Sequence, residues 1–270
     1  MVSLKDITAS LFELGVRQGD TIIVHSSLKS FGQVYGGADT VIDALIESVG
    51  SEGTVVVPTL AMKNFSEAYN TWHIDKPSDT GLITEVFRKR PNALRSDQAT
   101  HSVAAIGKKA EYLTATHGQT GLRYGIYGNS PFAEDSPWQK LYDMNAKIVM
   151  LGVSFESCTL RHLCEYTLVD RALSRAKEKG KYDEFIKSVC CFETRHLRDE
   201  NYFWPYINHE RFVEEIDKNG LSREVICGEA TLKLASSKEV CDFFIESPWE
   251  SPEKWFETNI ASWYKRAKEL

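Results

Sequence analysis

The sequence of 270 residues lacks several features that would assign it to familiar protein classes. It has no excess of positive charge, because 32 Lys and Arg residues stand against 38 Asp and Glu residues, a formal net charge of −6. Nucleic-acid binding rests on clustered Lys and Arg, so we expect no nucleic-acid partner. No segment approaches the roughly 18 apolar residues of a membrane helix. The first residues also lack the basic start and apolar run of a signal peptide. We therefore expect a cytoplasmic chain without a membrane partner.

Motifs for metal binding and for serine hydrolysis are also missing. The six cysteines form no C-x-x-C pair, and their scatter is typical of free thiols in a reducing compartment. Neither H-E-x-x-H nor H-x-H occurs, and no serine lies in a G-x-S-x-G elbow. We therefore expect no metal cofactor. A site built from His25, His101, His162 and Glu165 is the alternative.

Short apolar runs alternate with amphipathic segments through most of the chain. The runs "TIIVHSS", "GTVVVPTL" and "KIVMLGV" are typical of buried strands, and apolar residues three or four apart predict helices between them. This order predicts an α/β layered fold. With no repeat or long linker, we expect one domain over residues 1–270. It would have a core over 1–172 and a smaller C-terminal α+β lobe over 173–270, where alternation predicts a strand at 185–197.

Polar residues follow the predicted strands at their carboxyl ends, where open α/β sheets bind ligands. His25, Ser26 and Ser27 end the first strand, and Thr59 ends the second. The glycine pair at 36–37 then opens a helix, whose N-terminus offers unpaired N–H groups to anions. The Gly-Lys-Ser/Thr ending of a phosphate-binding loop is absent. The alternative for these residues is a turn followed by a helix cap.

The stretch "CTLRHLCEYTLVDR" at 158–171 places His162 three residues before Glu165 on a predicted helix. Apolar residues line one side of this helix, while Tyr166 and Val169 share the side of the His–Glu pair. We therefore expect both sides to be covered, with the pair lining a cavity. A carboxylate beside an imidazole fixes its tautomer and stabilises the imidazolium, as a general base requires. The alternative is an exposed ion pair worth a few tenths of a kcal/mol.

Aromatic residues gather in or beside two segments without clear periodicity, 61–79 and 118–131. Either they stack on a sugar or base, or they pack the loops against the domain. His101 starts a strand and is either a ligand contact or a structural histidine. The aromatic residues are Trp72, Tyr124, Tyr127, Phe132 and Trp138.

Several ordered stretches resemble one family. "VHSSLKSFGQVYGGADTVIDALIESVGSEGTVVVPTL" is similar to the N-terminal signature of the aminoglycoside 3-N-acetyltransferases. "PSDTGLITEVFRKRPNALRSDQATHSVAAIG" and "NSPFAEDSPWQKLYDMNAKIVMLGV" continue the resemblance in order, and "SCTLRHLCEY" resembles the family's helix with its His-x-x-Glu pair. The resemblance covers residues 4–171, and the last hundred residues match weakly.

The resemblance implies a three-layer α/β/α fold with a mixed sheet, and direct transfer from an acyl-CoA to a primary amine. It implies that His162 is the general base and that Glu165 orients it. His25, Ser26, Ser27 and Leu28 would contact the pantetheine and pyrophosphate of acetyl-CoA or another acyl-CoA, with Thr59 and Ser102 nearby. The expected partners are thus acyl-CoA and an amine-bearing small molecule, and a homodimer stays open.

Arg161 lies beside the proposed base, where we expect a neutral residue in antibiotic-modifying relatives. An inward Arg would repel a polycationic aminoglycoside and could bind phosphate instead. The sequence therefore favours a nucleotide-linked amino sugar as acceptor, bound by Arg161, Trp72 and Tyr124. An aminoglycoside is the first alternative. A relative that binds CoA or a sugar without catalysis is the second.

Overall fold

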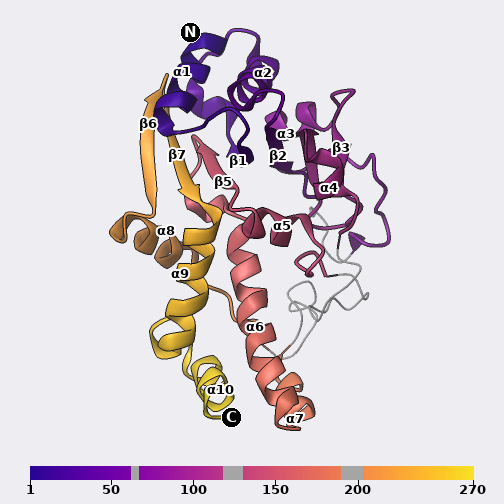
Figure 1. Cartoon of the computed structure of the whole chain (residues 1–270), viewed down its shortest axis with the longest axis vertical. Coiled ribbons are helices and arrows are strands. Elements are labelled where there is room, and N and C mark those ends of the chain that lie inside the picture. Colours follow the sequence, from indigo (N-terminus) through magenta and orange to yellow (C-terminus); the bar gives the residue numbers. More distant parts are fainter. Residues whose placement is uncertain (62–66, 118–129, 190–202) are drawn as a thin grey trace.

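The computed structural model describes residues 1–61, 67–117, 130–189 and 203–270. A seven-stranded sheet crosses the molecule in the order β3-β4-β2-β1-β5-β7-β6 (Figure 1). The strands are β1 (Thr21–Ser26), β2 (Thr54–Pro58), β3 (Leu94–Arg95), β4 (Val103–Gly107), β5 (Lys147–Leu151), β6 (Ser222–Cys227) and β7 (Ala230–Ser236). The predicted runs at 21–27, 53–60 and 147–153 thus correspond to β1, β2 and β5.

The sheet is mixed, as the resemblance implies. At the centre of the sheet, β1 is parallel to both β2 and β5. On either side of these three strands, β4 is antiparallel to β2 and β7 is antiparallel to β5. Pro58 at the end of β2 therefore pairs with Val103 at the start of β4, and Leu151 at the end of β5 pairs with Leu232 near the start of β7. The carboxyl ends of β1, β2 and β5 and the starts of β4 and β7 consequently lie at one edge of the sheet, the edge at which the sequence predicted a site.

Helices cover both faces of the sheet and confirm the three-layer α/β/α architecture. Because successive strand residues face opposite sides, Ile22 and Val24 pack in one apolar cluster and Ile23 in the other. The first face is covered by α1 (Leu4–Leu14), α2 (Gly37–Val49) and α3 (Leu82–Phe87). The second is covered by α4 (Ala110–Thr114), α5 (Pro137–Asp143), α6 (Leu160–Glu178) and α9 (Ser237–Glu250).

The C-terminal residues extend this sheet. Strand β7 pairs with β5 along its length, and α9 lies beside α6 (Figure 1). We therefore propose a single domain in which residues 173–270 complete the sheet and the second helical layer. The remaining helices are α7 (Tyr182–Ile186), α8 (His209–Lys218) and α10 (Thr258–Glu269).

Two details of the C-terminal part differ from the sequence prediction. Phe185 and Ile186 belong to α7, and Val189 forms only an isolated bridge to Phe203, so the predicted strand does not begin at 185. Residues 190–197 of that prediction lie outside the described ranges. The charged residues from 174 onward continue α6 to Glu178. Arg175 and Lys177 lie in its last turn, where their positive charges interact favourably with the negative end of the helix dipole. Among the described helices, none is long and apolar enough to cross a membrane.

Candidate active site

Helix α6 begins just beyond the edge where the central strands end. After β5 the chain turns at Gly152, whose φ of 66° suits glycine, and passes through a short 3-10 turn, Phe155–Ser157. Both sides of the helix are covered, as predicted, because Leu163 and Leu168 are buried on one side and Tyr166 and Val169 on the other. Residues on its first turns are therefore held by packing close to the strand ends.

His162 and Glu165 form the hydrogen-bonded pair that their spacing predicted. His162 Nδ1 lies 2.9 Å from Glu165 Oε2, and the two side chains are 15% and 0% exposed. This rules out the alternative of a solvated surface pair. Because a carboxylate only accepts, His162 Nδ1 carries the hydrogen, so in the neutral ring Nε2 is the nitrogen without one. The pair therefore has the tautomer that a general base needs.

Residues from another part of the chain complete the surroundings of Glu165. The indole N–H of Trp204 donates to Oε2 at 3.1 Å, and the backbone N–H of Ile207 donates to Oε1 at 2.9 Å. Arg161 Nε lies 4.0 Å from Oε1. These contacts hold the buried carboxylate of Glu165 in place against the imidazole.

Arg161 is buried beside Glu165, the carboxylate of the His162–Glu165 pair. Its side chain is 3% exposed, and Nη1 donates to the carbonyl oxygen of Ile207 at 3.1 Å. Burial lowers its pKa, and the charge of Glu165 opposes this effect. Arg161 and Glu165 thus hold the two polar groups of one residue, Ile207. This position gives no support to the prediction that Arg161 binds a phosphate of the acceptor.

Aromatic rings enclose the imidazole of His162. Phe132 lies 6.0 Å from it between ring centroids and 5.2 Å from Tyr166, which in turn lies 4.4 Å from Trp204. The ring of His101 stands at 74° to that of His162 at 6.0 Å. These apolar neighbours lower the local dielectric and so strengthen the interactions of the charged groups.

His101 is a buried, neutral histidine. Burial lowers its pKa well below the usual range, and the neighbouring His162 and His117 lower it further. Its Nδ1 lies 2.8 Å from Thr100 Oγ1, and its carbonyl oxygen accepts from Trp138 Nε1 at 3.0 Å. His101 therefore has a structural role at the start of β4 and also borders the His162 ring.

The four residues predicted at the end of β1 do not share one orientation. His25 lies opposite Met150 and faces the layer of α6, whereas Ser26 faces the layer of α2. Ser27 donates its backbone N–H to the Leu151 carbonyl at 2.9 Å. Leu28 begins a 3-10 turn, Leu28–Phe31, and packs half-buried against the core.

His25 and Ser26 each contain a buried polar atom without a partner. Within the described residues, neither His25 Nε2 nor Ser26 Oγ makes a hydrogen bond. Burial lowers the pKa of His25 to about 4, so this imidazole is neutral near pH 7. Buried polar atoms without partners are rare in folded proteins and point to a ligand or water.

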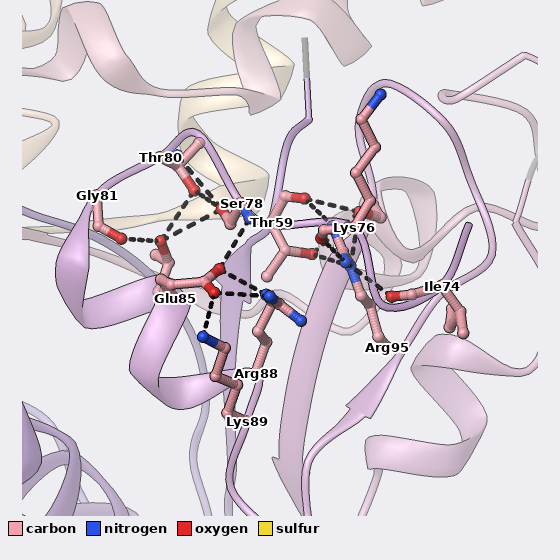
Figure 2. Close-up of polar contacts among 12 residues, drawn as sticks. Thr59, Ile74, Lys76, Ser78, Thr80, Gly81, Glu85, Arg88, Lys89 and Arg95 are labelled. Carbon is pink, nitrogen blue, oxygen red and sulfur yellow. Dashed lines mark hydrogen bonds and ion pairs between the residues drawn. The ribbon is translucent and has the colours of Figure 1, made fainter. Parts of the chain in front are cut away.

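Thr59 and Ser102, which were predicted near the acyl-CoA, lie together, and a third residue joins them. Their hydroxyl oxygens are 3.0 Å apart, and Arg95 Nε lies 3.1 Å from Thr59 Oγ1 and 3.2 Å from Ser102 Oγ (Figure 2). Arg95 also donates to the carbonyl oxygens of Ile74 and Lys76 at 2.8 and 2.5 Å. Both hydroxyls therefore help to hold a guanidinium that ties residues 74–76 to the sheet.

Trp72 belongs to the same cluster. Its indole N–H donates to Asp97 at 2.7 Å, and the guanidinium of Arg95 lies 4.8 Å from the ring centroid. Trp72 is thus packed against the protein, in line with the second interpretation of the loop aromatics. Tyr124 and Tyr127 lie outside the described residues.

Sequence reasoning missed Arg95, Trp204 and Ile207. Arg95 sits in a strand of two residues, Leu94–Arg95, which is too short to leave a pattern. The aromatic stretch "FWPY" before α8 is a signal for a packed segment, but nothing in it indicates which carboxylate Trp204 meets. Across the described ranges, no three His, Cys, Asp or Glu side chains are grouped to hold a metal.

The comparisons with known proteins agree with the resemblance. The model of the family described as aminoglycoside 3-N-acetyltransferase matches residues 23–247. The chain belongs to this family. A member from Bacillus subtilis, the SPbeta prophage-derived aminoglycoside N(3')-acetyltransferase-like protein YokD, is 34% identical over 185 residues. That match covers 61% of this chain and 65% of the relative, slightly less than two thirds of its length.

Two solved structures of the family share the fold at lower identity. The complex of AAC-IIIb with CoASH has a TM-score of 0.67 at 22% identity and covers 95% of this chain and 98% of the other. The sisomicin-bound structure of AAC-VIa has a TM-score of 0.68 at 21% identity and covers 93% and 98%. The likeness therefore extends through the C-terminal hundred residues, where the sequence resemblance is weak.

Proposed function

We propose that this protein is a CoA-dependent N-acetyltransferase that acylates a primary amine of an aminoglycoside. The observation that carries the proposal is the buried pair of His162 and Glu165, with Nδ1 held at 2.9 Å from the carboxylate. A base fixed in this tautomer, at the strand-end edge of an α/β sheet, suits proton removal from an attacking amine. Family membership supplies the expected donor and acceptor classes.

The reaction would proceed by direct attack. The amine nitrogen forms a bond to the thioester carbonyl carbon while His162 Nε2 accepts a proton from the nitrogen. The C–S bond then breaks, and the thiolate of CoA takes up a proton, which gives the N-acetyl amine and CoASH. Glu165 stabilises the imidazolium that forms in between. The aromatic neighbours of His162 limit its exposure to water and so strengthen this stabilisation.

His25 and Ser26 fit a donor with hydrogen-bonding groups along its length. His25 Nε2 and Ser26 Oγ are buried and make no hydrogen bond to any described residue. Pantetheine carries two amides, whose N–H and C=O groups match a neutral imidazole and a hydroxyl. Because the two side chains face opposite layers, such a donor would have to cross the end of β1 to meet both.

An aminoglycoside fits the chain better as acceptor than a nucleotide-linked amino sugar. The argument for a phosphate-bearing acceptor rested on Arg161, whose guanidinium is buried against Glu165 and Ile207. Ile207 also lines a cavity of about 1000 Å³. The lining of this cavity includes Trp255 and the exposed residues Glu210 and Glu257. Carboxylates and an aromatic ring match the ammonium groups and sugar faces of a polycation.

The test is thiol release from acetyl-CoA with three additions: a panel of aminoglycosides, a nucleotide-linked amino sugar, and no acceptor. We expect release with at least one aminoglycoside, together with a product heavier by one acetyl group. Release with the nucleotide sugar alone would contradict the acceptor assignment. If acetyl-CoA and its longer acyl homologues bind but no amine triggers release, the chain is a CoA-binding relative and not an enzyme.

A further inference from the structure

We propose that Phe132 limits the size of the acyl group that the enzyme transfers, because its ring fills the space beside the base. The inference deepens the proposed function and rests on it for the place of the reacting carbon near His162. It names a residue that selects among acyl-CoA donors and takes no part in proton transfer. The donors it excludes are those with acyl chains longer than acetyl.

The acyl group of the donor has to lie close to His162 when the amine attacks. A base takes a proton from an atom about 2.6–3.2 Å away. The attacking nitrogen and the carbonyl carbon are about 3–3.5 Å apart in a reactive arrangement. The methyl group of an acetyl donor is bonded to that carbon, so it lies against the groups that surround the imidazole. Whatever occupies this layer therefore limits how far an acyl chain can extend.

The phenyl ring of Phe132 belongs to this layer. Its centroid lies 6.0 Å from that of His162, 5.0 Å from that of His101 and 5.2 Å from that of Tyr166. Phe132 is 0% exposed, so the space beside the imidazole on this side is already filled. The ring of His101 also lies 6.0 Å from that of His162, but it is polar, whereas an acyl chain is apolar and matches a phenyl ring.

The neighbours of Phe132 hold the ring in place. Trp138 packs against it at 6.0 Å between ring centroids. The carbonyl oxygen of the preceding residue, Pro131, accepts from His117 Nε2 at 2.8 Å, and His117 Nδ1 lies 2.8 Å from Ser96 Oγ. A ring that is packed on one side and tethered through the adjacent backbone resists displacement by a longer acyl chain.

This packing gives a definite expectation for the donor. Extra methylene groups in a packed interior force their neighbours to move, which is unfavourable. In an apolar pocket, one methylene changes discrimination by about 10–200-fold. We therefore expect wild type to favour acetyl-CoA over butyryl-CoA by at least about tenfold.

Two substitutions grade the space beside the base. Phe132→Ala removes the ring, and the void that it leaves exceeds the two extra methylene groups of a butyryl chain. Phe132→Leu removes less and is the milder variant if Phe132→Ala does not fold. The matched controls are Phe87→Ala and Phe87→Leu, because Phe87 is equally buried but lies in the apolar cluster on the other face of the sheet.

The first readout is the affinity for acetyl-CoA and butyryl-CoA, measured by isothermal titration calorimetry. We expect the preference for acetyl-CoA to fall at least about tenfold in Phe132→Ala and about threefold in Phe132→Leu, with no change in the controls. An unchanged preference in folded Phe132→Leu would overturn the proposal. This measurement needs no acceptor, so it decides the inference even if every amine fails. If neither donor binds to wild type, the proposed function fails and the inference fails with it.

The second readout is kcat/KM for the two donors with the same accepted amine. We expect the ratio of butyryl-CoA to acetyl-CoA to rise in both Phe132 variants, even where the rate with acetyl-CoA falls. An equal loss with both donors would indicate a purely structural role for Phe132 and overturn the proposal.

Discussion

Two polar networks lie at the same edge of the sheet, and each is built around one buried charge. At Glu165 an anion is surrounded by donors from α6 and from residues 204–207. At Arg95 a cation is surrounded by oxygen atoms of Thr59, Ser102, Ile74 and Lys76 (Figure 2). The first network orients the imidazole of His162, the residue that we propose as the base. The second uses its donors to tie down backbone.

The difference shows how similar elements serve catalysis and architecture. Around Glu165, one of the donors is the imidazole of His162, the side-chain type most often used as a general base. Around Arg95, the acceptors are hydroxyls and carbonyls, none of which titrates near pH 7. Burial lowers the pKa of Arg95 to about 10, which still leaves it charged. We therefore propose a catalytic role for the network of Glu165 and loop anchoring for that of Arg95.

The largest expected effect comes from Glu165→Gln. The amide keeps the shape but removes the charge that stabilises the imidazolium, so kcat/KM should fall about 10³-fold. It also leaves Arg161 buried without a counter-charge, which should destabilise the fold by about 3 kcal/mol. Glu246→Gln, which breaks the exposed pair with Arg171, is the control and should change neither quantity much. Equal activity in Glu165→Gln and wild type would remove the distinction between the two networks.

Arg95→Met should affect stability more than chemistry. It removes the donors to Thr59, Ser102, Ile74 and Lys76, and we expect the free energy of unfolding to fall by about 2–4 kcal/mol in urea titrations. For comparison, Arg266→Met breaks an exposed pair with Glu184 and should stay within about 0.5 kcal/mol. A selective loss of kcat with unchanged stability would instead make Arg95 part of the chemistry.

The smallest effect concerns Glu85, which fixes the far end of the loop held by Arg95. Burial raises its pKa, but hydrogen bonds from Arg88, Lys89 and the backbone of Ser78 outweigh this and lower it to about 2 (Figure 2). Because the folded pKa lies below the ordinary value of 4.5, the contribution to stability is complete above pH 4.5. It disappears as the pH falls toward 2.

Glu85→Gln should therefore flatten the fall in unfolding free energy between pH 4.5 and 2, by about 1 kcal/mol or less for such a partly solvated group. Urea titrations at several pH values would measure this. A wild-type curve that is already flat in that range would contradict the role of Glu85.

The sequence predicted what local patterns encode. Apolar runs located β1, β2 and β5, and the three-residue spacing of His162 and Glu165 predicted their contact, because one helical turn brings such residues together. The prediction that α6 is covered on both sides is also confirmed. It could be made from local sequence because both sides of the helix carry apolar residues.

What the sequence did not reveal depends on contacts between distant segments. Trp204 and Ile207 meet Glu165 across 39 and 42 residues, and no spacing rule connects them. Arg161 lies between the two sides of the helical wheel, so only the packing of residues 204–207 decides that it is buried. The inference about a phosphate-bearing acceptor depended on that one side chain, and the buried position of Arg161 gives the inference no support.

The account is tested most directly by measuring acetyl transfer from acetyl-CoA to an aminoglycoside with wild type and His162→Asn, after circular dichroism has shown that both are folded. Asparagine preserves a polar side chain at the 15% exposed position but cannot accept the proton. We predict transfer by wild type and a loss of at least about 10²-fold in the variant. Equal rates for the two proteins would contradict the assignment of His162 as the base.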